Sequence, residues 1–106
     1  MTTPYTPESL TRADVDALRG PAVLDFGTNW CGYCRAAARF IEPALADRPD
    51  VRRVQVEDGK GRRLGRSYGV KLWPTLVFLR DGDEVARVVR PGNRAVLDEA
   101  LAQLQP

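Results

Sequence analysis

The two cysteines of the chain, Cys31 and Cys34, are the residues whose type and spacing most directly suggest chemistry. Two residues, Gly32 and Tyr33, separate them in the segment NWCGYCR, residues 29–35. A pair with this spacing can be a redox-active dithiol, can supply two ligands to a metal ion, or can be two unreactive thiols. The remaining sequence has to distinguish these three possibilities.

Histidine is absent from the chain. Its absence excludes a Cys–His nucleophilic pair, a Ser–His–Asp triad and any histidine-ligated metal. A structural zinc ion takes four ligands, usually cysteine or histidine, and this chain offers two cysteines. A metal site would have to be shared between two chains, so we expect no metal ligands within one chain.

The composition suits one compact globular domain over residues 1–106, with 43% hydrophobic and 28% charged residues. A net charge of +2 is too small to argue for a nucleic-acid partner. The basic stretch GKGRRLGR, residues 59–66, has no interleaved aromatic residues and is interpreted as a solvated loop. No apolar run is long enough to span a membrane, and the first ten residues lack signal-peptide features. We therefore expect a cytoplasmic protein without a membrane partner.

The elements that must position the cysteines follow from hydrophobic patterning. Helices are predicted over residues 7–19 and 31–47 and from residue 93 onward, with a short helix within 59–69, and strands over 22–26, 51–56, 75–79 and 84–89. Strand–helix–strand order favours parallel neighbours, while the turn signal Asp81-Gly82 predicts an antiparallel hairpin. The prediction is an α/β fold with one central mixed sheet of about four strands, flanked by helices on both faces.

This arrangement places Cys31 at the start of a helix that follows a central strand. Thr28 or Asn29 is expected to cap that helix, and Pro43 to bend or interrupt it. Unpaired N–H groups and the helix dipole favour a thiolate at such a position. Cys34 lies one turn further on, within disulfide reach of Cys31. The pattern predicts an exposed nucleophile, Cys31, with Cys34 as its resolving partner.

A single acid, Asp25, interrupts the apolar run AVLDF of residues 22–26. Burial disfavours the charged form, so we expect a raised pKa for Asp25. A carboxyl group that titrates nearer neutrality can accept the proton of Cys34 as that thiol attacks. The alternative is an acid merely tolerated near a strand end. Tyr5 and Tyr68 are expected to be packing residues rather than acid–base groups.

Two segments together resemble the thioredoxin family, over about residues 8–104. VLDFGTNWCGYC is similar to the strand, turn and active-site segment of the family, whose usual motif is Trp-Cys-Gly-Pro-Cys. YGVKLWPTLVFLRDGDEV resembles the segment that carries the family's cis-proline and the hairpin after it. A lone CxxC is a weak signal, whereas CxxC followed at this distance by a Pro-Thr strand is specific. The resemblance implies a thioredoxin fold.

The resemblance also implies roles for individual residues. Cys31 would attack a disulfide in a protein substrate, Cys34 would release the reduced substrate, and Asp25 would be the buried acid beneath them. Pro74 would be the cis-proline. The implied substrate-binding residues are Trp30, Gly32, Tyr33, Trp73, Pro74 and Thr75. Electrons would come from a thioredoxin reductase to a monomer that binds no cofactor and uses only its Cys31–Cys34 disulfide.

The sequence departs from the family pattern around the docking groove. Tyr33 replaces the usual proline, and tyrosine before the second cysteine is common in glutaredoxins. Gly27 replaces an aromatic residue, Trp73 replaces a smaller aliphatic one, and Arg39 stands where a helix proline normally lies. Pro91 is at or near the position of a groove glycine. These changes predict an altered groove and a substrate range that is narrower than, or different from, that of a general thioredoxin.

Three functions are compatible with these residues. The favoured one is a thiol–disulfide oxidoreductase that reduces protein disulfides through a mixed disulfide on Cys31. A second is a glutathione-linked, glutaredoxin-like reductase, suggested by Tyr33. A third is a binding module that holds a partner near Trp30 and Trp73, with the cysteine chemistry incidental.

Overall fold

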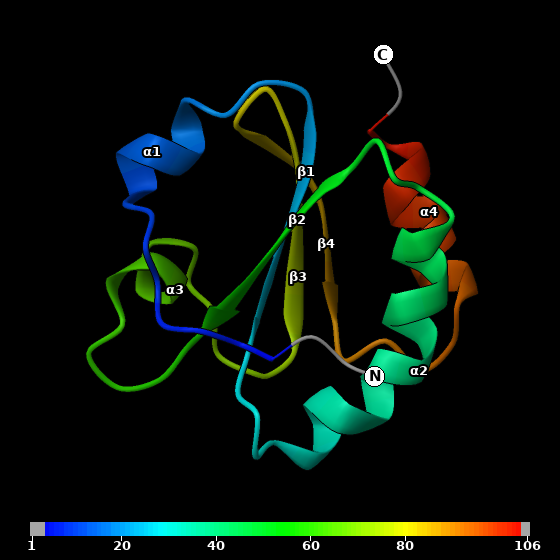
Figure 1. The fold of residues 1–106 in the computed structure, drawn as a ribbon, viewed down its shortest axis with the longest axis horizontal. Coiled ribbons are helices and arrows are strands. Elements are labelled where there is room, and N and C mark those ends of the chain that lie inside the picture. The colour runs from blue at the N-terminus through cyan, green and yellow to red at the C-terminus, as the bar shows by residue number, and fades with distance from the viewer. Residues whose placement is uncertain (1–3, 105–106) are drawn as a thin grey trace.

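A computed structural model describes residues 4–104, and in this range helices and strands follow one another in the predicted order (Figure 1). The elements are α1 (Arg12–Asp16), β1 (Pro21–Gly27), α2 (Gly32–Ala46), β2 (Arg52–Glu57), α3 (Arg63–Ser67), β3 (Thr75–Arg80), β4 (Asp83–Val89) and α4 (Ala95–Ala102). The first three and last two residues of the predicted domain lie outside the described range.

The four strands form one mixed sheet in the order β2-β1-β3-β4. β1 pairs in parallel with β2 and antiparallel with β3, and β3 pairs antiparallel with β4. The β3–β4 hairpin turns at Asp81 and Gly82, whose φ angles of 51° and 83° are the left-handed values that Asp-Gly turns favour. The predicted mixed sheet and hairpin are confirmed.

Helices cover both faces of the sheet, with α1 and α3 on one side and α2 and α4 on the other (Figure 1). Strand β1 is one of the two inner strands, and its side chains alternate between the two cores. Leu24 and Phe26 pack with α1 and α3, whereas Val23 packs with α2 and α4. Asp25 shares the face of Val23, because residues two apart on a strand point the same way. The alternation therefore directs Asp25 toward α2.

The first helix is shorter than predicted and begins at Arg12 instead of residue 7. Thr11 and Asp14 form a capping box there: the Thr11 Oγ1 accepts from the Asp14 N–H at 3.1 Å, and the Asp14 carboxylate accepts from the Thr11 N–H at 2.9 Å. Such a reciprocal cap fixes a helix start. The preceding Glu8 caps α3 instead, where its carboxylate accepts from the backbone N–H of Arg63 and Leu64.

Helix α2 begins differently from the prediction, since neither Thr28 nor Asn29 is its cap. The Cys31 sulfur takes that place and accepts from the Cys34 N–H at 3.3 Å. Pro43 lies inside α2, which continues to Ala46 while its axis changes direction along its length (Figure 1). The bend is the expected effect of a residue that has no N–H and crowds the preceding turn. A helix thus presents its N-terminus directly to the cysteines.

Candidate active site

Cys31 and Cys34 lie where β1 passes into α2, and both are free thiols. Cys31 is the N-cap residue of α2 and Cys34 lies within its first turn, so both sulfurs share the positive end of the helix. The N–H of Cys34 points at the Cys31 sulfur, and such a donor stabilises negative charge on sulfur. Cys31 is only 7% exposed, which makes it less accessible than the sequence predicted.

Cys34 lies deeper than Cys31, at 3% exposed. Burial raises the pKa of the Cys34 thiol to about 12, and the Cys31 sulfur beside it contributes to the same shift. At neutral pH Cys34 is therefore a neutral thiol, which is a poor nucleophile. Its attack on another sulfur requires a base that removes its proton.

Asp25 is fully buried on β1, as predicted. Its Oδ1 accepts from the Tyr5 hydroxyl at 2.8 Å, and its Oδ2 lies 3.3 Å from a terminal guanidinium nitrogen of Arg53 on β2. Arg53 also pairs with Glu42 of α2. Burial raises the pKa of Asp25, while Tyr5 and Arg53 partly oppose that shift. The acid is thus held in a charged and hydrogen-bonded cluster beneath the cysteines.

Tyr5 differs from the prediction that it only packs, because its hydroxyl bonds to Asp25. Its buried ring lies in one cluster with Cys31 and Cys34. Asn29 fixes the backbone of Tyr5 through two hydrogen bonds, accepting from its N–H at 2.8 Å and donating to its carbonyl at 3.1 Å. Sequence spacing gave no indication of the contact between Tyr5 and Asp25, which lie 20 positions apart.

Gly27 provides the space for the Tyr5 ring. A Cβ atom at Gly27 would lie 2.7 Å from the Cys34 sulfur and 2.8 Å from Cζ of Tyr5. Real Cβ atoms do not approach other atoms so closely, so only glycine fits between the two side chains. The absence of a side chain at Gly27, noted in the sequence, was the one available signal that another residue fills this volume.

Two exposed aromatic residues flank the cysteines at the surface. Trp30 is 72% exposed and Tyr33 is 59% exposed. The ring of Trp30 meets the edge of Trp73 in a T-shaped contact with centroids 5.6 Å apart. The indole N–H of Trp73 donates to the Asp58 carboxylate at 2.8 Å. Gly32, the first residue of α2, is exposed between the cysteines. The structure thus brings these four predicted docking residues to one surface.

Pro74 and Thr75 lie behind this surface. The Trp73–Pro74 peptide bond is cis, as the resemblance implied. Thr75 is only 1% exposed, and its hydroxyl donates to the Leu72 carbonyl at 2.6 Å. Its side chain therefore supports the loop that carries Trp73 and presents no surface to solvent.

Arg90 is a residue of this surface that sequence reasoning missed. It has a φ of 49°, and its N–H donates to the Pro74 carbonyl at 2.9 Å. Its guanidinium lies 3.7 Å over the Tyr33 ring, and its Nε donates to the Trp73 carbonyl at 2.9 Å. The prediction pointed to Pro91, which is buried. The side chain that contacts Tyr33 and Trp73 at this surface is that of Arg90.

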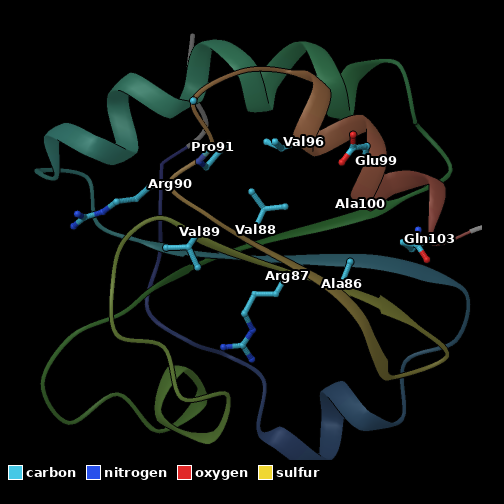
Figure 2. Close-up of a pocket in the computed structure, with 11 residues that line it drawn as sticks. Ala86, Arg87, Val88, Val89, Arg90, Pro91, Val96, Glu99, Ala100 and Gln103 are labelled. Carbon is cyan, nitrogen blue, oxygen red and sulfur yellow. The ribbon is translucent and has the colours of Figure 1, made fainter.

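A separate surface groove lies between β4 and α4, and Arg90 stands at one end of it. Figure 2 shows Val88, Val96 and Ala100 inside this groove, whereas the Arg90 side chain extends away from it. Arg90 thus belongs to the cysteine surface rather than to the groove. Within residues 4–104, no three or more cysteine or acidic side chains are grouped as metal ligands would be. The helices of this range include none that is long and apolar enough to cross a membrane.

Comparisons with known proteins agree with this geometry. The family model described as Thioredoxin matches residues 5–103. Thioredoxin Asp f 28 of Aspergillus fumigatus is 33% identical over 85 residues, which are 80% of this chain and 79% of that protein. The solved structure of thioredoxin 2 from Pseudomonas aeruginosa PAO1 in its reduced form is 56% identical, with a TM-score of 0.86 over 98% of this chain and 96% of that one. The chain therefore belongs to the thioredoxin family of thiol–disulfide oxidoreductases.

Proposed function

We propose that this oxidoreductase reduces disulfides in other proteins, with Cys31 as the nucleophile and Cys34 as the resolving thiol. The observation that carries the proposal is the asymmetry of the two sulfurs. Cys31 caps the positive end of α2 and receives an N–H donor, whereas Cys34 lies deeper and is neutral. The Cys31 sulfur can therefore attack a substrate first, and the Cys34 sulfur reacts only in a second step.

The reaction proceeds through two exchanges. The Cys31 thiolate attacks one sulfur of the substrate disulfide, forms a mixed disulfide, and the other substrate sulfur leaves as a thiolate. Cys34 then gives its proton to the Asp25 carboxylate and attacks the Cys31 sulfur. The Cys31–Cys34 disulfide forms and the second substrate thiolate leaves. The two electrons that reduce the substrate come from the two cysteines.

Asp25 serves as the base of the second exchange in this scheme. It is fully buried on the face of β1 that α2 covers, and its negative charge is one of the causes that raise the pKa of Cys34. Burial also raises the pKa of Asp25 itself, which makes its carboxylate a stronger base. A stronger base removes the thiol proton more readily.

The reduction potential of the Cys31–Cys34 pair indicates which electron donor can reduce it. We propose a thioredoxin reductase as donor and a cytoplasmic monomer as the working form. Equilibration against a glutathione or dithiothreitol buffer tests the donor. A potential near about −270 mV supports it, whereas a value of about −200 mV or above favours the glutathione-linked alternative. The absence of any reversible two-electron transition would refute the reductase and leave the binding-module reading.

Arg90 is proposed to bias the substrate range toward acidic peptides. Within residues 4–104 no carboxylate pairs with the Arg90 side chain, whose Nε donates to the Trp73 carbonyl and whose guanidinium lies over the Tyr33 ring. Its two terminal nitrogens are therefore available beside the cysteine surface. A disulfide flanked by glutamate would gain a charge pair there, while one flanked by lysine would be repelled.

Replacing Arg90 with glutamine should reduce this preference. The ratio of kcat/KM for a glutamate-flanked over a lysine-flanked peptide disulfide is expected to fall roughly twofold to fivefold, the range of an exposed charge pair. Steady-state reduction of the two peptides measures the ratio. Arg52→Gln is the matched control, because Arg52 pairs with Ala22 at the far end of β1 from the cysteines. An unchanged ratio in Arg90→Gln would contradict the proposal.

A further inference from the structure

We propose that Tyr5 is a positioning residue of the resolving step, acting through Asp25. The inference rests on the proposed function, in which Asp25 accepts the Cys34 proton. It assigns the N-terminal segment a part in catalysis that its sequence did not suggest. The hydroxyl of Tyr5 holds one carboxylate oxygen of Asp25 and sets how readily that carboxylate takes a proton.

The placement of Tyr5 is specific rather than incidental. Its hydroxyl lies 2.8 Å from Oδ1 of Asp25, in a fully buried setting where an unmatched polar group is costly. Its backbone is fixed by the reciprocal bonds to Asn29, two residues before Cys31. The next residue, Thr6, continues this anchorage, since its carbonyl accepts from the N–H of Glu57 at 2.7 Å. The segment is thus attached to the active-site turn and to β2.

The Tyr5 ring also faces the resolving cysteine. A Cβ placed at Gly27 would contact both Cζ of Tyr5 and the sulfur of Cys34, so the two side chains border the same small space. Tyr5, Cys31 and Cys34 form one buried cluster. The hydroxyl that bonds to Asp25 is therefore held next to the thiol whose proton Asp25 accepts.

The charged groups that face Asp25 define what the hydroxyl changes. Arg53 from β2 and the Tyr5 hydroxyl stabilise the carboxylate form, whereas Glu42 from α2 and an ionised Cys34 disfavour it. Removal of the hydroxyl leaves Arg53 as the main stabilising partner. More of Asp25 is then protonated at a given pH, and a protonated Asp25 cannot accept the Cys34 proton. The resolving step should therefore require a higher pH.

The reaction with dithiobis(nitrobenzoate) tests this, because its two exchanges are seen separately. The first thionitrobenzoate released reports the attack by Cys31, and the second reports the attack by Cys34 on the mixed disulfide. In Tyr5→Phe the second release is expected to slow roughly tenfold on the acid side of its pH profile, the fold-change of one hydrogen bond to a charged group. Its acid limb moves to higher pH, and the rates converge at high pH. The first release stays unchanged.

Tyr68→Phe is the matched control. Tyr68 is also a buried tyrosine, but it lies in the core under α1 and α3, and its hydroxyl has no partner among the described residues. Its loss should leave both releases unaltered. In an Asp25→Asn background, Tyr5→Phe should add no further shift, because the hydroxyl acts through Asp25.

Three results would overturn the proposal: an unmoved acid limb in a folded Tyr5→Phe protein, an equal shift in Tyr68→Phe, or a shift that persists in the Asp25→Asn background. Near-ultraviolet circular dichroism and thermal unfolding establish that each variant is folded. Failure of the first release in the unmodified protein would instead refute the proposed function, so the two failures are distinguishable.

Discussion

Replacing Cys31 with serine is expected to reduce disulfide reductase activity to the uncatalysed background. A serine hydroxyl is not ionised at neutral pH, and oxygen cannot form the mixed disulfide that the reaction passes through. Turnover of any protein disulfide, followed with a chemical or enzymatic electron donor, measures the loss. The fold should persist, because the cap at this position can be supplied by a serine oxygen.

Replacing Cys34 with serine separates the two exchanges. Cys31 still attacks the substrate, but no thiol remains to resolve the product, so the mixed disulfide should accumulate with one substrate molecule per chain. Mass spectrometry under non-reducing conditions detects it, and dithiothreitol should release it. The Cys31→Ser variant is the control and should trap nothing. Trapping by Cys31→Ser and not by Cys34→Ser would reverse the assigned roles of the two cysteines.

The order of helices and strands was predictable because the strands that form the centre of the sheet are strongly apolar. β1 and β3 are buried on both faces, and such strands appear in the sequence as short unbroken hydrophobic runs. The Asp81-Gly82 turn fixed the hairpin for an equally local reason, since its residues tolerate positive φ. The position of the CxxC pair in the fold was predictable because the pair lies between the segments that form β1 and α2. Each of these features depends on neighbours within a few positions.

Two side-chain contacts of the site that escaped prediction join distant segments. Tyr5 meets Asp25 across 20 positions, and Arg90 meets the Trp73 carbonyl across 17. Neither partner changes the local hydrophobic pattern, so periodicity carries no signal of the contact. The start of the first helix was predicted wrongly because of another contact between distant segments. Glu8 lies in a helix-like pattern, but its carboxylate caps α3, which keeps the chain before Thr11 out of the helix.

Asp25→Asn is expected to slow the resolving step on the order of 10²-fold and to make the protein more stable at neutral and alkaline pH. The first effect follows because general bases contribute roughly 10²–10⁴-fold and an amide cannot accept the Cys34 proton. The second follows because a buried carboxylate loses hydration that its partners replace only in part. An asparagine oxygen still accepts from Tyr5 and carries no charge.

The pH dependence of stability gives the sign of the second effect. Burial raises the pKa of Asp25 in the folded protein above its unfolded value of 3.8, so the folded state binds the proton more tightly. The stability of the unmodified protein therefore falls as pH rises from the unfolded value through the folded one, and it is then constant. The asparagine side chain does not titrate in this pH range. The stability advantage of Asp25→Asn should grow over this window and then level off.

Urea unfolding of both proteins at a series of pH values measures this difference. Asp50→Asn is the control, since Asp50 is exposed and Arg48 lowers the pKa of its carboxylate. That substitution should confer no advantage that grows with pH, because a lowered pKa stabilises the folded state above the unfolded value and this contribution is lost as pH falls. A constant difference between Asp25→Asn and the unmodified protein across the series would mean that Asp25 titrates alike in both states. Asp25 would then lack the raised proton affinity that its role as the base of Cys34 requires.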